Sequence, residues 1–147
     1  MSDVFSPEKR SWIMSRVKGR DTKPEILVRS FVFRMGFRFR LHQRKLPGTP
    51  DIVLPRHRKV IFVHGCFWHG HKGCSRSKRP SSNVRFWNNK LDANIRRDKR
   101  FRRQLRRMGW KSLVVWECET RSPEKLLHKL ERFLHEEKSS KQSKNRS

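Results

Sequence analysis

The positions of the cysteines constrain the fold of this chain more than any other feature of its sequence. Cys66, His71 and Cys74 lie within nine residues, in the spacing C-x4-H-x2-C, and the only other cysteine is Cys118. Three thiolates and one imidazole are the ligand set of a closed, tetrahedral structural zinc site. Folding should therefore tie a polar loop to a distant segment through Zn²⁺. His69 could replace His71 as the imidazole ligand, because C-x2-H is also a possible chelate.

Hydrophobic spacing and turn residues predict one α/β domain in which helices flank a mixed sheet. Thr22 to Glu25 has the pattern of a capping box, and Gly36 and Gly109 stand where helices should end. The apolar run over 60–63 indicates a strand that is buried on both faces. The expected elements are a short helix over 7–17, a helix over 22–35, strands over 37–41, 51–54 and 59–64, a long helix over 84–108, a strand over 110–117 and a helix over 123–135. The core order is thus α-β-β-β-α-β, with a further helix at each end.

The charge balance indicates nucleic acid as the partner. The chain has 38 Lys and Arg against 13 Asp and Glu, a formal net charge of +25. Such a chain repels itself in the compact state, and each phosphate that it contacts releases counterions. No apolar run approaches the roughly 20 residues of a membrane span, and the N-terminus lacks the apolar segment of an export signal. We therefore expect a cytoplasmic, nucleoid-associated protein.

A carboxylate at the start of a strand is the first candidate for chemistry. Asp51 follows a tight turn and should lie opposite the end of the next strand, at residues 63–64. It could hold Mg²⁺ against a scissile phosphate, although it could also simply cap the turn. Glu25 could support it, in addition to its capping role. Asp98, one of two acids on the long basic helix, has local charge balance as its simpler role.

Two histidines bracket the segment that contains Cys66. His64 and His69 both titrate near neutral pH, so either could act as a general acid or base. Their position beside the expected zinc site and next to the basic helix favours chemistry over a structural role.

Paired aromatic residues stand in polar surroundings. Phe67 and Trp68 are adjacent in the loop, and Phe86 and Trp87 begin the long helix. Adjacent loop residues rarely both point inward, so we expect exposed aromatic rings beside basic residues. Such rings can wedge between base steps, and unstacking is easiest at a mispaired site.

Together these residues resemble the very-short-patch-repair (Vsr) endonucleases, the bacterial T:G mismatch endonucleases. The likeness covers about 6–134, and HGCFWH is its most specific motif. The matching stretches are RSWIMSRVK (10–18), DTKPE (21–25), LPGTPD (46–51), VIFVHGCFWH (60–69), FW (86–87), RD (97–98), GW (109–110) and VWEC (115–118).

The resemblance implies a restriction-endonuclease-like fold and a magnesium-dependent, strand-specific nick 5′ to the mispaired thymine. The basic segment over 1–20 is expected to form an arm, which the resemblance makes a DNA clamp, ahead of an endonuclease domain over 21–136. The polar composition of residues 137–147 predicts a disordered tail. The resemblance implies coupling to mismatch-repair factors, and wedges from one side suggest a monomer.

The resemblance also implies a role for each candidate residue. Asp51 and the backbone carbonyl of Val63 would bind Mg²⁺. His69 would act in acid–base chemistry with His64 beside the phosphate, and Glu25 and Asp98 would be supporting acids. Zinc is assigned to Cys66, His71, Cys74 and Cys118, the wedge to Phe67, Trp68 and Trp87, and further DNA contacts to Met14, Arg16 and Lys18 of the arm.

Two other functions would explain part of the sequence. A zinc-containing, non-catalytic DNA-binding protein accounts for the charge and the cysteines, but gives no reason for Asp51, His64 and His69 to converge. A nuclease of the same fold that acts on junctions or on recognition sites accounts for all of these residues and differs in its substrate.

Overall fold

The computed structural model describes residues 22–146, and the side chains of residues 22–135. The predicted N-terminal helix and the basic arm over 1–20 lie outside the described residues. So do the expected DNA contacts Met14, Arg16 and Lys18.

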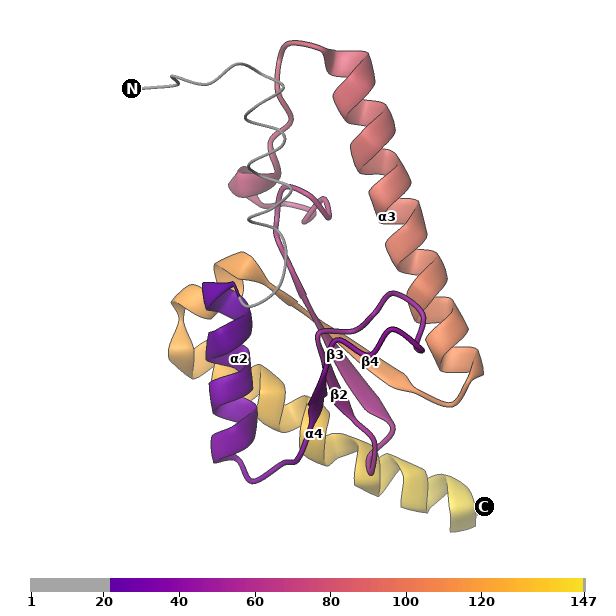
Figure 1. The fold of residues 1–147 in the computed structure, drawn as a ribbon. Helices are drawn as coiled ribbons and strands as arrows, with labels where there is room; N and C mark the ends of the chain where they lie inside the picture. Colours follow the sequence, from indigo (N-terminus) through magenta and orange to yellow (C-terminus); the bar gives the residue numbers. More distant parts are fainter. Residues whose placement is uncertain (1–21, 147) are drawn as a thin grey trace.

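In the described part of the chain, four strands form one mixed sheet in the order β1-β2-β3-β4 (Figure 1). The strands are β1 (Arg40–Leu41), β2 (Ile52–Leu54), β3 (Lys59–His64) and β4 (Lys111–Trp116). β1 pairs antiparallel with β2, β2 pairs antiparallel with β3, and β3 pairs parallel with β4. The predicted mixed sheet of an α/β fold is therefore confirmed.

The first strand is shorter than predicted. Residues 37–39, which were expected to belong to it, lie outside β1. Arg40 pairs with Val53, so a longer strand would soon lie opposite Pro55, which has no N–H to donate. Phe37 and Phe39 instead pack against the hydrophobic core. Packing rather than strand pairing thus holds this segment.

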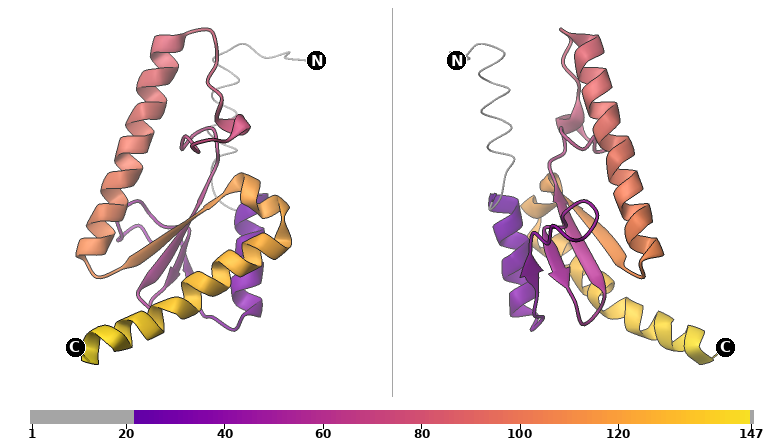
Figure 2. Two further views of the ribbon diagram at one scale, coloured as in Figure 1. Left: turned by 180° about the vertical axis from the view of Figure 1, so that it is seen from behind. Right: turned by 45° about the vertical axis from the view of Figure 1, so that its right-hand side comes forward.

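Within residues 22–146, three α-helices cover the two faces of the sheet. On one face, α2 (Lys23–Arg34) and α4 (Pro123–Arg146) enclose a core that includes Val32, Ile61 and Leu130. On the other face, Leu105 of α3 (Val84–Arg107) packs against Val60 and other residues of the sheet. The right-hand view of Figure 2 shows the sheet between α2 and the lower part of α3. As predicted, β3 is buried on both faces.

The helix ends follow their sequence signals. Thr22 and Glu25 form the predicted capping box at the start of α2, and Gly36 follows its end with a φ of +90°. Gly109 follows α3 with a φ of +89°. Only glycine adopts this left-handed backbone freely, which is why both helices end where the sequence predicted.

Helix α4 runs beyond its predicted end at about residue 135, to Arg146. It takes in residues 137–146 of the segment that was expected to be a disordered polar tail. No glycine or proline follows Pro123, and most of the added residues are Glu, Lys, Gln and Arg, which have high helix propensity. Within the described residues, no helix is long and apolar enough to cross a membrane.

The upper half of α3 projects past the sheet, and the loop from β3 returns beside it (Figures 1 and 2). Asn94 of α3 donates to the carbonyl of Trp68 at 3.1 Å. Arg79 donates to Asp92 at 2.7 Å. Gly70 has a φ of +62°, and a Cβ there would lie 2.5 Å from the side chain of Ile95. The loop is therefore held against α3 along its length.

Candidate functional site

A cleft of about 830 Å³ gathers the residues for which the sequence predicted chemistry. It opens between the first turn of α2, the ends of β2 and β3, and the middle of α3. Arg97 and Arg102 add positive charge to its wall. The predicted residues in its lining are Glu25, Asp51, Val63, His64, Phe67, Trp68, His69 and Asp98.

Asp51 lies where the pairing of β2 with β3 ends. Its Oδ2 accepts a hydrogen bond of 2.6 Å from the backbone N–H of Val63, in place of a backbone carbonyl. Burial raises the pKa of Asp51 to about 6. The hydrogen bond from Val63 and the charges of His42 and Arg29 oppose this rise in pKa, whereas the charge of Glu25 adds to it. A buried carboxylate next to a second acid is suited to a divalent cation.

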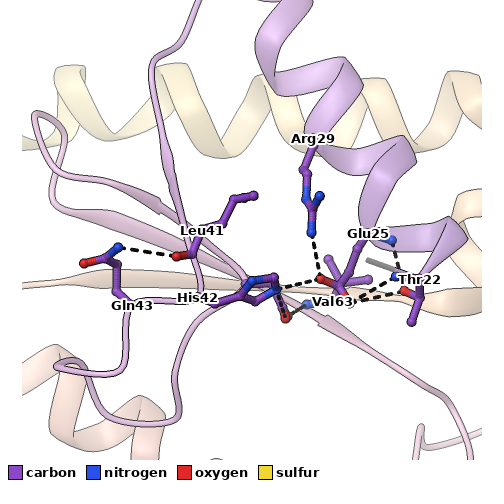
Figure 3. A network of polar contacts seen from close by, with 8 residues as sticks. Thr22, Glu25, Arg29, Leu41, His42, Gln43 and Val63 are labelled. Atoms are coloured by element: carbon purple, nitrogen blue, oxygen red, sulfur yellow. Dashed lines mark hydrogen bonds and ion pairs between the residues drawn. The ribbon is translucent and has the colours of Figure 1, made fainter. Parts of the chain in front are cut away.

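Glu25, which lines the cleft, is the centre of a polar network (Figure 3). Its Oε1 accepts from the hydroxyl of Thr22 at 3.3 Å, and its Oε2 accepts from Arg29 at 3.3 Å and from Nε2 of His42 at 2.9 Å. The same His42 nitrogen is 3.9 Å from Oδ1 of Asp51. Glu25 thus keeps its predicted capping role and also connects with Asp51.

Sequence reasoning missed two members of this network. The spacing of Glu25 and Arg29, four residues apart on a helix, is a signal that could have found Arg29. His42 follows a short edge strand and has a positive φ of +45°, which no spacing rule predicts for a histidine.

The two predicted imidazoles lie face to face. The rings of His64 and His69 are stacked, with centroids 3.8 Å apart and planes 6° from parallel. Nδ1 of His69 is 2.6 Å from Oδ2 of Asp98. Burial raises the pKa of Asp98, but the hydrogen bond from His69 and nearby positive charges outweigh it and hold this pKa below its usual value. An ionised Asp98 therefore fixes the ring of His69 and leaves its other nitrogen free to exchange protons.

The cysteines converge as their spacing predicted. The ligand atoms of Cys66, His71, Cys74 and Cys118 all lie within 4.8 Å of one another. Sulfurs around a tetrahedral zinc with Zn–S bonds of about 2.3 Å would be about 3.8 Å apart. His71 is the imidazole of this group, with Nδ1 3.4 Å from the sulfur of Cys118, whereas His69 faces Asp98.

The donor set fits a structural zinc ion. Cys66 is fully buried, and this burial raises the pKa of its thiol to about 12. Such a thiol ionises near neutral pH only beside a cation that binds sulfur. The ring of His71 is stacked on Trp116 at 4.2 Å, which fixes its orientation. Zinc here would join the loop to the residues that follow β4.

The aromatic residues form a cluster that joins the loop to α3. The ring centroids of Phe67, Trp68 and Trp87 are 5.2–5.9 Å apart. Trp68 is only 8 % exposed, whereas Phe86 at the outer edge is 56 % exposed. Of the two adjacent loop aromatics, Trp68 is thus the buried one, because its neighbours from α3 cover it, whereas Phe67 is half-buried.

The comparisons with known proteins agree on one family. The family model described as DNA mismatch endonuclease Vsr matches residues 2–76. A type II nicking enzyme of Xanthomonas oryzae pv. oryzae is 50 % identical over 119 residues, which cover 81 % of this chain and 87 % of the relative. A type II nicking enzyme of Neisseria meningitidis serogroup A is 42 % identical over 136 residues, covering 92 % and 96 %. The DNA mismatch endonuclease Vsr of Escherichia coli K12 is 42 % identical over 126 residues, covering 86 % and 80 %.

Proposed function

Because the chain belongs to the Vsr family of DNA mismatch endonucleases, we propose that it nicks duplex DNA 5′ to the thymine of a T:G mismatch. The cleft that gathers Asp51, His64, His69 and Asp98 carries this proposal. A DNA-binding protein without catalytic activity has no use for such an arrangement. The net charge of +25 suits the phosphates of the duplex.

The fold and the zinc site are part of the same proposal. We assign the domain over 21–136 to the restriction-endonuclease-like folds, which the order α2-β1-β2-β3-α3-β4 supports. We assign structural Zn²⁺ to Cys66, His71, Cys74 and Cys118, whose ligand atoms suit it. Zinc would hold the loop so that His69 and the aromatic cluster keep their places.

Asp51 and Val63 would hold the catalytic metal. The N–H and the carbonyl of a strand residue point to the same neighbouring strand. The carbonyl of Val63 therefore faces the side on which Asp51 accepts the N–H of Val63. When bound, Mg²⁺ supplies charge stabilisation at the scissile phosphate and a lowered pKa of the attacking water. Both donors are oxygen atoms, which Mg²⁺ prefers.

His69 would move the proton. Hydrolysis of a phosphodiester needs a group that takes a proton from the attacking water and one that supplies a proton to the leaving oxygen. Asp98 holds Nδ1 of His69 at 2.6 Å, so the opposite ring nitrogen is oriented for one of these steps. His64, stacked on His69, would contact the phosphate.

A cleavage assay tests the proposed function. Duplexes with one T:G mismatch and matched T:A duplexes are incubated with the protein in Mg²⁺ or in EDTA. We expect one nick, in the thymine strand of the T:G duplex, in Mg²⁺ alone. Equal cutting of the matched duplex, or no cutting in Mg²⁺, would contradict the proposal. A panel with DNA junctions detects a nuclease of the same fold with another substrate.

Replacing Asp98 by asparagine should slow the nick without weakening DNA binding. The amide lacks the charge that stabilises the proton on His69, and general acid–base catalysis contributes about 100–10,000-fold, so we expect a loss of activity in this range. Single-turnover rates at saturating T:G duplex measure this effect. Asp92→Asn is the matched control, because Asp92 is the other acid of α3 and pairs with Arg79 instead. Equal single-turnover nicking rates for Asp98→Asn and Asp92→Asn would show that Asp98 has no role in the chemical step.

Phe67, Trp68 and Trp87 would form the wedge, and Phe67→Ala should reduce discrimination between mismatched and matched DNA. Stacking of a base on an aromatic ring contributes about 1–3 kcal/mol, so the affinity for the T:G duplex should fall about 5–160-fold. Binding in EDTA, followed by fluorescence anisotropy, separates this effect from cleavage. Phe33→Ala is the control, since Phe33 is 72 % exposed on α2 and lies outside the cluster. An unchanged preference for T:G would contradict the assignment.

A further inference from the structure

The ring of His42 lies between the two acids Glu25 and Asp51. The sequence separation of these three residues does not suggest this arrangement. The backbone N–H of His42 donates to the carbonyl of Asp51 at 3.3 Å. Its ring nitrogen Nε2 donates to Glu25 at 2.9 Å and lies 3.9 Å from the carboxylate of Asp51. His42 is not among the residues that line the cleft, so its ring supports the two acids from behind.

The backbone of His42 is held in an unfavourable conformation. Its φ of +45° belongs to the left-handed region, which residues with a Cβ adopt rarely. Such a conformation persists when surrounding contacts determine it, and it is found most often at functional sites. Here the contacts are the backbone bond to Asp51 and the ring bond to Glu25.

Glu25 has little capacity left to act on a substrate or a metal. Thr22 occupies Oε1, and Arg29 and His42 occupy Oε2 (Figure 3). A carboxylate whose two oxygens both accept hydrogen bonds from protein groups is held in one orientation. The ring of His42 connects Glu25 with Asp51: its Nε2 is 2.9 Å from Oε2 of Glu25 and 3.9 Å from Oδ1 of Asp51.

We propose that His42 is a positioning residue: it transmits the fixed position of Glu25 to Asp51 and so sets the affinity of Asp51 for a divalent cation. The inference rests on the proposed function, because it concerns the same metal. The ring N–H of His42 lies between the carboxylates of Glu25 and Asp51. The backbone N–H of His42 also donates to the backbone carbonyl of Asp51, which fixes the position of that residue. Groups that orient a metal ligand in this way affect metal affinity about 10–100-fold.

The test measures metal binding apart from activity. Mn²⁺ is titrated into the full-length, zinc-loaded protein without DNA, and free Mn²⁺ is followed by electron paramagnetic resonance. We expect His42→Ala to bind Mn²⁺ about 10–100-fold more weakly than the wild type. His42→Gln, whose amide nitrogen can occupy the place of Nε2, should restore most of the affinity. In nicking assays, His42→Ala should lower kcat and leave KM for the T:G duplex unchanged.

A matched histidine controls for a general loss of structure. His57 is half-buried like His42, but it follows the C-terminal end of β2, at the opposite end of this strand from Asp51. Its ring packs against Phe37. His57→Ala should bind Mn²⁺ and nick as the wild type does, and thermal melting identifies any variant that fails to fold. His42→Gln carries the same backbone strain as His42→Ala, so rescue by glutamine assigns the effect to the side-chain contact.

A double-mutant cycle tests whether Glu25 acts through His42. Glu25→Gln keeps an oxygen for Thr22 but turns an amide N–H toward Arg29 and His42. If Glu25 and His42 act as one unit, the variant that carries both substitutions should have the same Mn²⁺ affinity as whichever single variant has the lower affinity. Additive losses, or a His42→Ala variant with unchanged Mn²⁺ affinity, would overturn the inference. A wild type that binds Mn²⁺ but does not nick T:G duplexes would refute the proposed function and leave this inference standing.

Discussion

Replacing Asp51 by asparagine should abolish nicking and, at the same time, raise the thermal stability of the metal-free protein. The variant loses the carboxylate charge that Mg²⁺ requires, and loss of several kcal/mol of charge stabilisation slows the chemical step about 1000-fold or more. The oxygen of the new amide can still accept the N–H of Val63, so the fold keeps this bond. Binding of the mismatched duplex in EDTA should survive.

The gain in stability follows from the pKa of Asp51. Folding raises this pKa from 3.8 to about 6, so the native state favours the protonated carboxyl. The stability that this group contributes is present below pH 3.8 and is lost as the pH rises through about 6. The loss corresponds to at most about 3 kcal/mol near neutral pH. An asparagine side chain does not ionise, so the advantage of the variant should be full above about pH 7 and absent below about pH 4.

Thermal melts in EDTA at several pH values, together with single-turnover nicking in Mg²⁺, measure both effects. Asp92→Asn serves as the control, because Asp92 lies outside the cleft and its pKa is lowered by its hydrogen bond to Arg79. It should nick normally and gain no stability. An Asp51→Asn variant that still nicks, or one that is less stable than the wild type near neutral pH, would contradict this assignment of the metal site.

Replacing Cys66 by serine should remove the zinc ion and, with it, the order of the loop over 65–83. Zinc bound by four such ligands stabilises small domains by about 10–16 kcal/mol at neutral pH, which is more than one ordinary contact contributes. Cys66 is fully buried, so the variant also leaves a buried hydroxyl in place of the thiolate. We expect zinc content near zero, a much lower melting temperature and no nicking, because His69 belongs to the same loop.

Elemental analysis, melting curves and nicking assays of the purified variant check this prediction. Lys72→Ala is the control, because Lys72 is exposed in the loop between two of the proposed ligands. It should retain one zinc ion per chain and normal activity. A Cys66→Ser protein that keeps its zinc and its melting temperature would contradict the four-ligand site.

The parts of this fold that the sequence predicted depend on local signals. The capping box at Thr22 and the glycines at 36 and 109 each act within a few residues, and all three mark helix boundaries as expected. The meeting of the three cysteines with one histidine could also be predicted, because thiolates and imidazole form the ligand set of a structural zinc site. Spacing alone left His69 and His71 as alternatives, and only the resemblance separated them.

The parts that were missed depend on tertiary contacts. Residues 37–39 were expected in a strand, but Pro55 limits pairing and the core takes their side chains. Trp68 is buried because α3 returns across the loop. His42 reaches Glu25 through a left-handed turn between segments seventeen residues apart. No pattern along the chain encodes that contact, so the network around the two acids needed the structure.

The central claim is that Asp51 holds a metal ion beside the rings of His64 and His69, and paramagnetic broadening by Mn²⁺ tests it most directly. Histidine ring signals of the free protein are recorded by NMR during a Mn²⁺ titration. The claim predicts that the signals of His64 and His69 broaden first, together with that of His42, whose ring nitrogen is 3.9 Å from Asp51. The signals of His57, His128 and His135 should broaden much later, and Asp51→Asn should abolish this difference. If the rings of His64 and His69 keep sharp signals while Mn²⁺ binds, or broaden equally in Asp51→Asn, then the metal lies elsewhere and the claim is wrong.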